Sequence, residues 1–233
     1  MSETDICNNI KSIRQRIENV CEQCGRDPES VTLVAVSKMK PADDIRTAYE
    51  CGQVHFGENR VQEWEDKVEA IEEPVQWHMV GNLQTNKIKY LVDRIDWIHS
   101  IPKKKSLREL EKRASRIDRT INVLIQVNIS DEDQKSGCDP DQLKPLLEYA
   151  RTLEHVSVRG LMGIATFADD PEDVREEFVM LRKLRDQHKA QESDNIQLEH
   201  LSMGMTNDLE VAIQEGATMV RVGRAIFGER DYS

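Results

Sequence analysis

The sequence predicts an α/β fold, a single (β/α)₈ barrel over residues 1–233 with one extra helix at its start. From Val31 onward, eight short apolar runs alternate with amphipathic segments. Alternation of this kind is typical of βα units and a parallel sheet. No linker or low-complexity stretch divides the chain, and its 233 residues match the size of one barrel, which is commonly about 200–250 residues. One barrel therefore accounts for the whole pattern.

The extra helix comes first, because apolar residues between Ile10 and Val20 recur at helical spacing. A clear helix then follows the first strand over residues 41–52, with Pro41 suited to a first turn and Gly52 to a stop. An open doubly wound sheet is the alternative, but no G-x-G-x-x-G follows the first strand, which favours the closed barrel. We expect strands near residues 31–37, 54–58, 75–80, 96–100, 120–129, 156–165, 195–202 and 218–223.

Charge and composition exclude several kinds of protein. The net charge of −11 would repel nucleic acid and anionic membranes, and no apolar run reaches the roughly 18 residues of a membrane helix. The first 25 residues lack the apolar core of a signal peptide, so a cytoplasmic location is expected. The five cysteines are odd in number and scattered, which predicts reduced thiols, and nothing completes a metal site around the Cys21-x-x-Cys24 pair.

The segments that follow the strands carry the chemistry. The first strand, "VTLVAVSKMKP", ends in Lys38, and active sites of barrels lie at the carboxyl ends of the strands. After strands seven and eight, "SMGMTND" and "VGRAIFG" offer Ser202, Thr206, Gly223 and Arg224 as a phosphate cradle. A lysine across from such a cradle predicts a phosphorylated carbonyl ligand held as a Schiff base. Both a sugar phosphate in an aldolase and pyridoxal 5'-phosphate (PLP) fit this description.

Arg221 helps to choose between the two ligands. It precedes Gly223 by two residues on the last strand, so both side chains can point into the barrel. That position puts a guanidinium beside the cradle, where the pyridine nitrogen of PLP could lie. An ion pair that merely fills the barrel interior is the alternative for this arginine.

Five motifs in order then identify a family. "VAVSKMKP", "HFGENRVQE", "WHMVGNLQTNK", "GLMGIATF" and "LSMGMTNDLEVAIQEGATMVRVGRAIFG" together resemble the YggS/PROSC family of PLP-binding proteins, also called PLP homeostasis proteins. The resemblance runs from about Val31 to the C-terminus. The chain departs from it at Arg224, where the family often has threonine or serine, and at Gly163, where another residue is usual.

The resemblance implies a barrel like the N-terminal domain of alanine racemase, and it implies roles for individual residues. Lys38 would form the Schiff base with PLP, and Lys40 would be its solvated neighbour. Asn59 would lie against the cofactor, and Arg221 would face the pyridine nitrogen. Ser202, Gly223 and Arg224 would hold the phosphate, and Met162, Met203 and His78 would line the pocket.

Whether such a protein turns over substrate is a separate question. An arginine at the pyridine nitrogen weakens the electron sink that most PLP chemistry uses. The sequence stops at Ser233, without a second domain to supply a base on the opposite face of the cofactor, and its tyrosines fall in helical patterns or in the tail. We therefore expect a non-catalytic PLP-binding protein of vitamin B6 homeostasis, with indirect effects on amino-acid and keto-acid pools. A PLP enzyme acting on amino acids is the alternative.

The expected partners follow from this interpretation. They are PLP, amino acids that react with it, and PLP-dependent apo-enzymes that receive it. Because the sequence lacks the second domain that supplies the racemase dimer surface, a monomer is favoured.

Overall fold

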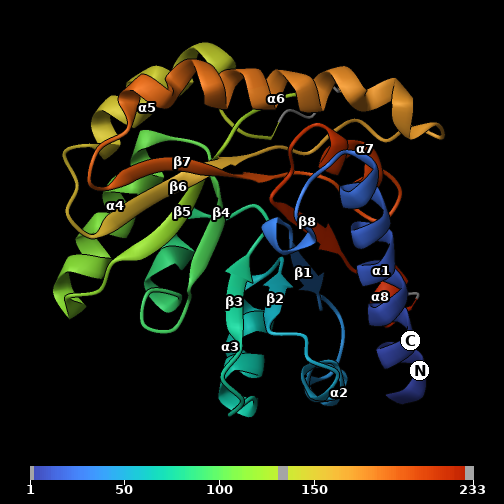
Figure 1. Ribbon diagram of the computed structural model, residues 1–233. Helices are drawn as coiled ribbons and strands as arrows, with labels where there is room; N and C mark the ends of the chain where they lie inside the picture. Colours follow the sequence, from blue (N-terminus) through green and yellow to red (C-terminus); the bar gives the residue numbers. More distant parts are fainter. Residues whose placement is uncertain (1–2, 131–135, 229–233) are drawn as a thin grey trace.

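The computed structural model describes residues 3–130 and 136–228, and within them eight parallel strands close into a barrel. Each strand pairs with the next, and β8 pairs with β1 (Figure 1). The strands are β1 (Thr32–Val36), β2 (His55–Glu58), β3 (Gln76–Met79), β4 (Trp97–Ile101), β5 (Ile121–Gln126), β6 (Val156–Met162), β7 (Ile196–Ser202) and β8 (Met219–Val222). The predicted fold class and all eight strands are confirmed.

Two strands end three residues earlier than predicted. After Gln126 the chain leaves the ladder, and Val127 forms an isolated bridge with Cys138. After Met162 the chain turns toward β8, where the carbonyl oxygen of Gly163 accepts a hydrogen bond from Arg221. In both cases an apolar run continues past the point where strand pairing stops, so the sequence pattern overstates the strand.

Helices cover the outside of the barrel (Figure 1). Between β3 and β4 the crossover is a 3₁₀ helix, η2, and not a longer α-helix. The α-helices are α1 (Glu3–Gln23), α2 (Ala42–Glu50), α3 (Val61–Ala70), α4 (Lys104–Ala114), α5 (Leu143–Ala150), α6 (Arg175–His188), α7 (Leu209–Gln214) and α8 (Arg224–Phe227). The 3₁₀ helices are η1 (Pro28–Ser30), η2 (Thr85–Tyr90), η3 (Ser115–Ile117), η4 (Pro140–Gln142), η5 (Pro171–Val174) and η6 (Lys189–Gln191). No helix within these described ranges is long and apolar enough to cross a membrane.

The predicted extra helix, α1, lies beside α7 and α8 (Figure 1). Its apolar stripe from Ile6 to Val20 is buried. Asn9 donates to the carbonyl oxygen of Ile226 in α8 at 3.0 Å, and Arg16 pairs with Glu210 of α7 at 2.7 Å. The helix therefore fastens the two C-terminal helices, which border the end of the barrel that carries the candidate site.

The expectation that all five cysteines are reduced is wrong for one pair. Cys7 of α1 and Cys51, at the end of α2, form a disulfide with their Cα atoms 5.5 Å apart. Sequence spacing could not reveal it, because the two residues are 44 positions apart. Cys21 is buried in the core, and the Cys24 thiol donates to the carbonyl oxygen of Val20.

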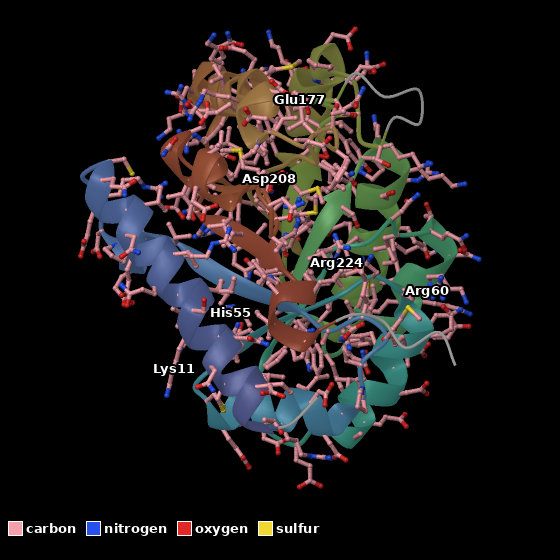
Figure 2. The ribbon with its side chains drawn as sticks, turned by 90° about the vertical axis from the view of Figure 1, so that its right-hand side faces the viewer. Lys11, His55, Arg60, Glu177, Asp208 and Arg224 are labelled. Carbon is pink, nitrogen blue, oxygen red and sulfur yellow. A yellow bond between two sulfur atoms is a disulfide. The ribbon has the colours of Figure 1, made fainter. Side chains whose placement is uncertain are left out.

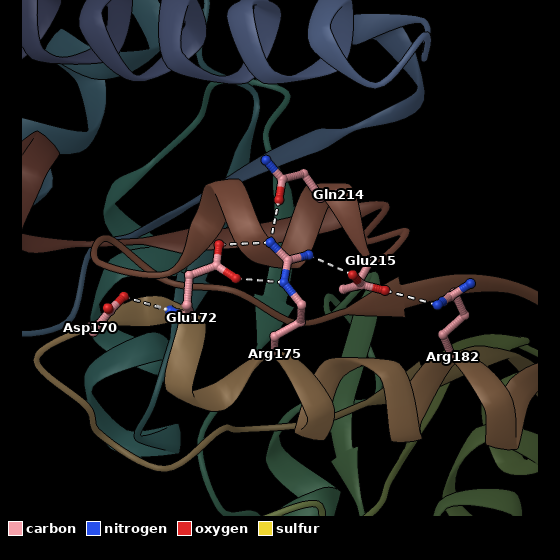
Figure 3. A network of polar contacts seen from close by, with 6 residues as sticks. All are labelled: Asp170, Glu172, Arg175, Arg182, Gln214 and Glu215. Atoms are coloured by element: carbon pink, nitrogen blue, oxygen red, sulfur yellow. Dashed lines mark hydrogen bonds and ion pairs between the residues drawn. The ribbon is translucent and has the colours of Figure 1, made fainter.

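A polar network joins α6 to the end of α7 (Figure 3). Arg175 contacts the carboxylates of Glu172 at 2.7 Å and Glu215 at 2.6 Å, and it also donates to Gln214. Arg182 reaches the second oxygen of Glu215 at 2.9 Å. Because two arginines share one carboxylate of low exposure, the segment before β8 is held against α6.

The barrel has two hydrophobic layers. The larger one lies between the strands and the surrounding helices. A smaller cluster contains Val34, Val36, Val80, Leu124, Met162 and Met219, with Trp97 packed against it. Because these residues alternate along their strands with residues of the larger cluster, they face the barrel interior. The interior is thus only partly apolar, and polar side chains complete it.

Candidate functional site

A pocket of about 310 Å³ opens at the carboxyl ends of the strands. Residues at or after the ends of β1, β2, β3, β6, β7 and β8 contribute its walls. The residues that line it are Val36, Lys38, Asn59, Val80, Ile164, Ala165, Thr166, Phe167, Ala168, Pro171, Val174, Met205, Thr206, Asn207, Asp208, Arg221, Gly223 and Arg224. The position matches the expectation that chemistry lies at this end of the barrel.

Lys38 is half-buried and lies two residues past the end of β1. The chain on both sides of it is fixed. The Ser37 hydroxyl donates to Glu58 at 2.6 Å, and the backbone N–H of Met39, which has a left-handed φ of 60°, donates to Glu63. The lysine therefore extends from a backbone whose course is set by side chains of other elements.

Lys67, from α3, is the centre of that support. Its ammonium lies 2.7 Å from each of three oxygens: the Ser37 carbonyl, a Glu58 carboxylate oxygen and a Glu63 carboxylate oxygen. Glu58 is fully buried, and burial raises the pKa of its carboxyl while the neighbouring Lys67 opposes that rise. One buried cation thus ties α3 and β2 to the residue before Lys38.

Arg221 forms the floor of the pocket. Its guanidinium donates to Ser202 Oγ at 2.7 Å and to the carbonyl oxygen of Gly163 at 2.9 Å. Burial lowers its pKa to about 10, an effect that nearby Asp208 opposes, so the group is a cation at neutral pH. A buried, oriented guanidinium with a face toward a cavity offers a fixed donor to a ligand.

The loop after β7 and the start of α8 form another wall of the pocket. Gly204 has a φ of +89°, and a Cβ there would lie 2.6 Å from the Cβ of Ala212, so the turn requires glycine. Its carbonyl oxygen accepts from the N–H of Arg221 at 3.0 Å, which ties the loop to β8. Asp208 and Arg224, labelled in Figure 2, lie on this wall.

Six of the ten residues singled out from the sequence come together in this pocket, and four lie behind it. Lys38, Asn59, Thr206, Arg221, Gly223 and Arg224 line it. His78, Met162, Ser202 and Met203 are fully buried and are not among its lining residues. Ser202 reaches the pocket only through Arg221, and Met162 packs inside the barrel.

Sequence reasoning missed the wall that follows β6. Ile164, Thr166 and Phe167 line the pocket, and Phe167 has 72% of its side chain exposed at the rim. Thr166 Oγ1 is buried, and no described residue gives it a hydrogen-bond partner. An orphaned hydroxyl at a pocket wall is a feature that a polar ligand would satisfy. Thr166 directly follows the strand predicted at residues 156–165, and this position is the signal in the sequence that could have identified it as a lining residue.

The donor set suits PLP. An amine, a buried guanidinium, an unpaired hydroxyl and the glycine-containing start of α8 line one cavity. An amine can bind an aldehyde, a guanidinium can face a ring nitrogen, and hydroxyl and backbone N–H groups can hold a phosphate. The fold and the site together define a barrel protein with a lysine-based pocket for a phosphorylated carbonyl compound.

Comparison with known proteins identifies the family. The family described as alanine racemase, N-terminal domain, matches residues 8–231. A pyridoxal phosphate homeostasis protein of Aquifex aeolicus is 45% identical, over 97% of this chain and 99% of the relative. The chain therefore belongs to the alanine racemase N-terminal domain family and, within it, to the pyridoxal phosphate homeostasis proteins.

Solved structures agree with this assignment. A structure described as an unknown protein from Bifidobacterium adolescentis is similar with a TM-score of 0.91 and 35% identity, covering 97% of this chain and 95% of the other. PipY from Synechococcus elongatus, solved with PLP bound, has a TM-score of 0.85 and 36% identity, covering 96% and 100%. The family resemblance drawn from the sequence motifs is thus confirmed.

Proposed function

We propose that this protein binds PLP in the pocket at the carboxyl end of the barrel and serves PLP homeostasis. The observation that carries the proposal is that Lys38 and the buried Arg221 line the same pocket. PipY, a relative of 36% identity over nearly the whole chain, has been solved with PLP. PLP, when bound, supplies an aldehyde that condenses with an amine and releases water.

Each lining residue is assigned a role in binding PLP from the chemistry of the groups it offers. Lys38 supplies the amine, and Lys67 holds the backbone that presents it. Arg221 presents a cation to the ring nitrogen, while Thr206, Gly223 and Arg224 offer donors to the phosphate. Asn59 lies on the wall next to Lys38 and would contact the ring. Ser202 is assigned a positioning role, because its hydroxyl accepts from Arg221 and it does not line the pocket.

We further propose that the protein holds and releases PLP without rapid turnover of amino acids. A racemase needs groups that move a proton on each face of the bound substrate. Among the described lining residues the ionisable side chains are Lys38, Asp208, Arg221 and Arg224, and no tyrosine or histidine lines the pocket. The guanidinium of Arg221 stays charged at neutral pH and cannot serve as a base.

Absorbance and chiral analysis test the two parts of this proposal. Purified protein should retain PLP at one equivalent and be yellow, whereas colourless protein that fails to take up added PLP would contradict the binding proposal. Loaded protein incubated with L-alanine should form no D-alanine beyond one equivalent. Multiple turnovers to D-alanine would contradict the carrier proposal and favour a PLP enzyme acting on amino acids.

Partners and location remain predictions within the same proposal. We expect free amino acids to exchange with Lys38 at the pocket, and PLP-dependent apo-enzymes to accept the released cofactor. We also expect a monomer, which light scattering of the loaded protein would test, and a location in the cytoplasm.

A further inference from the structure

A line of polar side chains crosses the interior of the barrel behind the pocket. His55, His78, His99 and Ser202, here called the histidine column, come from β2, β3, β4 and β7. His55 Nδ1 lies 3.0 Å from His78 Nε2, His78 Nδ1 lies 2.8 Å from His99 Nε2, and His99 Nδ1 lies 2.9 Å from Ser202 Oγ. The column thus joins β2 to the hydroxyl that contacts Arg221.

The register of the strands explains why the column runs from the N-terminal end of the barrel toward the carboxyl end. His78 pairs across the sheet with Gly57, which is two residues beyond His55, and with Trp97, which is two residues before His99. Each histidine therefore sits two residues further along its strand than the one before it. The first histidine lies at the N-terminal end of the barrel and the last near the carboxyl end.

The two ends of the column reach different pockets. His55 lines a second cavity, of about 600 Å³, beside the N-terminal ends of β1 and β2. The other end meets Arg221, which lines the pocket that contains Lys38. His78 and His99 are fully buried between them. An apolar interior would avoid the cost of burying these rings, so their presence needs a reason beyond stability.

Arg221 donates to one end of the column and favours one direction for its hydrogen bonds. A guanidinium only donates, so Ser202 Oγ accepts from Arg221, and its own proton must go to an acceptor. Among the described residues the remaining partner of that oxygen is His99 Nδ1, and the Ser202 proton is satisfied there when this nitrogen is unprotonated. A neutral His99 then carries its proton on Nε2 and donates to His78.

The same reasoning continues to the second cavity. His78 accepts on Nδ1, carries its proton on Nε2 and donates to His55 Nδ1. His55 therefore keeps its proton on Nε2. Burial holds the pKa values of His78 and His99 well below the ordinary value, which keeps both rings neutral at physiological pH. One polarity thus runs from Ser202 to His55.

We propose that the histidine column titrates as one unit: proton uptake at His55 reverses every hydrogen bond of the column, so that Ser202 accepts from His99. An added proton leaves His55 with hydrogen on both nitrogens, and its Nδ1 can then only donate. His78 must accept on Nε2 and carry its proton on Nδ1, and His99 must do the same. The balance is one proton taken from solvent. His55 gains the His78 Nε2 proton, His78 gains the His99 Nε2 proton and His99 gains the Ser202 proton, while the solvent proton replaces the one that Ser202 gives up.

The consequence at the pocket is a change in the Ser202 hydroxyl. Before the reversal its proton is committed to His99, and afterwards the oxygen accepts from both His99 and Arg221, so its proton can turn to another acceptor. The protonation state of His55, which lines the N-terminal cavity, is thereby coupled to Ser202, which contacts Arg221. His55, which lines one cavity, and Ser202, which contacts a lining residue of the other, are parts of one hydrogen-bonded system.

Several charged and titratable groups surround the column and set where it titrates. His55 is half-buried, and burial lowers its pKa while Asp96 opposes that effect. Proton uptake is therefore expected on the acid side of about pH 6.5. The groups near the column are Arg14 and Glu18 of α1, Glu29 of η1, Asp96 before β4, His200 of β7 and Arg221 of β8.

Nitrogen NMR of the full chain, labelled with ¹⁵N-histidine and free of cofactor, tests the proposal. Above about pH 7 the Nδ1 of both His78 and His99 should have the shift of an unprotonated nitrogen, and as His55 titrates both should move to the shift of a protonated nitrogen with the same midpoint. Titration of His55 with no change at His99 would overturn the proposal. So would an Nδ1-protonated His99 already at neutral pH.

Breaking the middle of the column gives a second test. In His78→Phe, His55 should still titrate but His99 should no longer respond. If that variant does not fold, His55→Phe should abolish the response of His99 on the acid side. His200→Gln is the matched control, because His200 is a half-buried interior histidine with a lowered pKa outside the column, and it should leave the coupling intact.

Each result is decisive without the cofactor. A persistent response in His78→Phe, or loss of the response in His200→Gln, would contradict the assigned path. Because PLP is absent throughout, these outcomes are independent of whether the protein binds PLP, and a failure of the proposed function would leave them unchanged.

Discussion

Lys67 donates to the carbonyl oxygen of Ser37 at 2.7 Å and so holds the backbone immediately before Lys38. The same ammonium pairs with Glu58, whose side chain is fully buried. A cation on the third helix is thereby connected to the chain beside Lys38, which lines the pocket. The network is more than a stabilising ion pair, because it fixes the direction from which Lys38 extends into the pocket.

The first prediction separates these two roles of Lys67. Lys67→Met leaves Glu58 buried without its cation and should destabilise the protein by about 3–5 kcal/mol. In Lys67→Met with Glu58→Leu the buried charge is gone, so much of the stability should return. The rate at which Lys38 captures added PLP should stay low in both variants, because Ser37 remains unsupported. Stopped-flow absorbance and urea unfolding measure the two effects, and recovery of the capture rate in the double variant would refute a positioning role.

The second prediction concerns Arg221 and the hydroxyl that it contacts. Ser202→Ala should shift the visible absorption of bound PLP in the same direction as Arg221→Lys, because both change the cation at the ring nitrogen. The affinity loss in Ser202→Ala should be small, on the order of 1 kcal/mol or about fivefold. Thr206→Val is the control: it should weaken PLP binding without moving the absorption. An unshifted spectrum in Ser202→Ala would contradict action through Arg221.

The third prediction concerns the turn at Gly204. Gly204→Ala should cost about 1–3 kcal/mol from the left-handed backbone, with an added cost from the contact with Ala212. Gly25→Ala is the matched control, since Gly25 also has a positive φ of 67° but nothing lies within 4 Å of an added Cβ. The difference in melting temperature between the two variants isolates the contact. Equal melting temperatures would show that the loop shifts to accommodate the added Cβ without a loss of stability.

The fourth prediction is a loss of stability on the acid side. His78 and His99 have pKa values lowered by burial, so below about pH 6.5 the unfolded chain binds protons that the native state does not. Stability therefore falls as the pH drops, by about 1.4 kcal/mol per pH unit for each such proton. Urea unfolding between about pH 7.5 and pH 5.5 measures the slope. A flat profile would mean that the native protein takes up protons over this range as readily as the unfolded chain, and it would contradict the prediction.

The sequence predicted the barrel because its signal is local. Apolar runs alternate with amphipathic helices, and each strand could be placed without knowing its neighbours. Lys38 and Arg221 could be placed at the same end of the barrel for the same reason, since both stand at the ends of identifiable strands. The ends of two strands were predicted less accurately, because an apolar run continues past the last paired residue, as after Gln126 and Met162.

Features that depend on register or on distant contacts could not be predicted. His55 and His99 can be recognised as neighbours of His78 only when β2, β3 and β4 are aligned in the observed register. Lys67 looks like any lysine of an amphipathic helix until α3 is placed against β2, where Lys67 reaches Glu58 and Ser37. The Cys7–Cys51 disulfide likewise depends on the packing of α1 against the end of α2.

The most direct test of the central claim is to identify the lysine that binds PLP. Borohydride reduction of loaded protein, followed by peptide mass spectrometry, should place the cofactor on Lys38 alone. Lys38→Ala should lose the visible absorption and the covalent adduct, while Lys40→Ala should keep both. Trapping of the cofactor on Lys40 or any other lysine of the unmodified protein, with none on Lys38, would contradict the account.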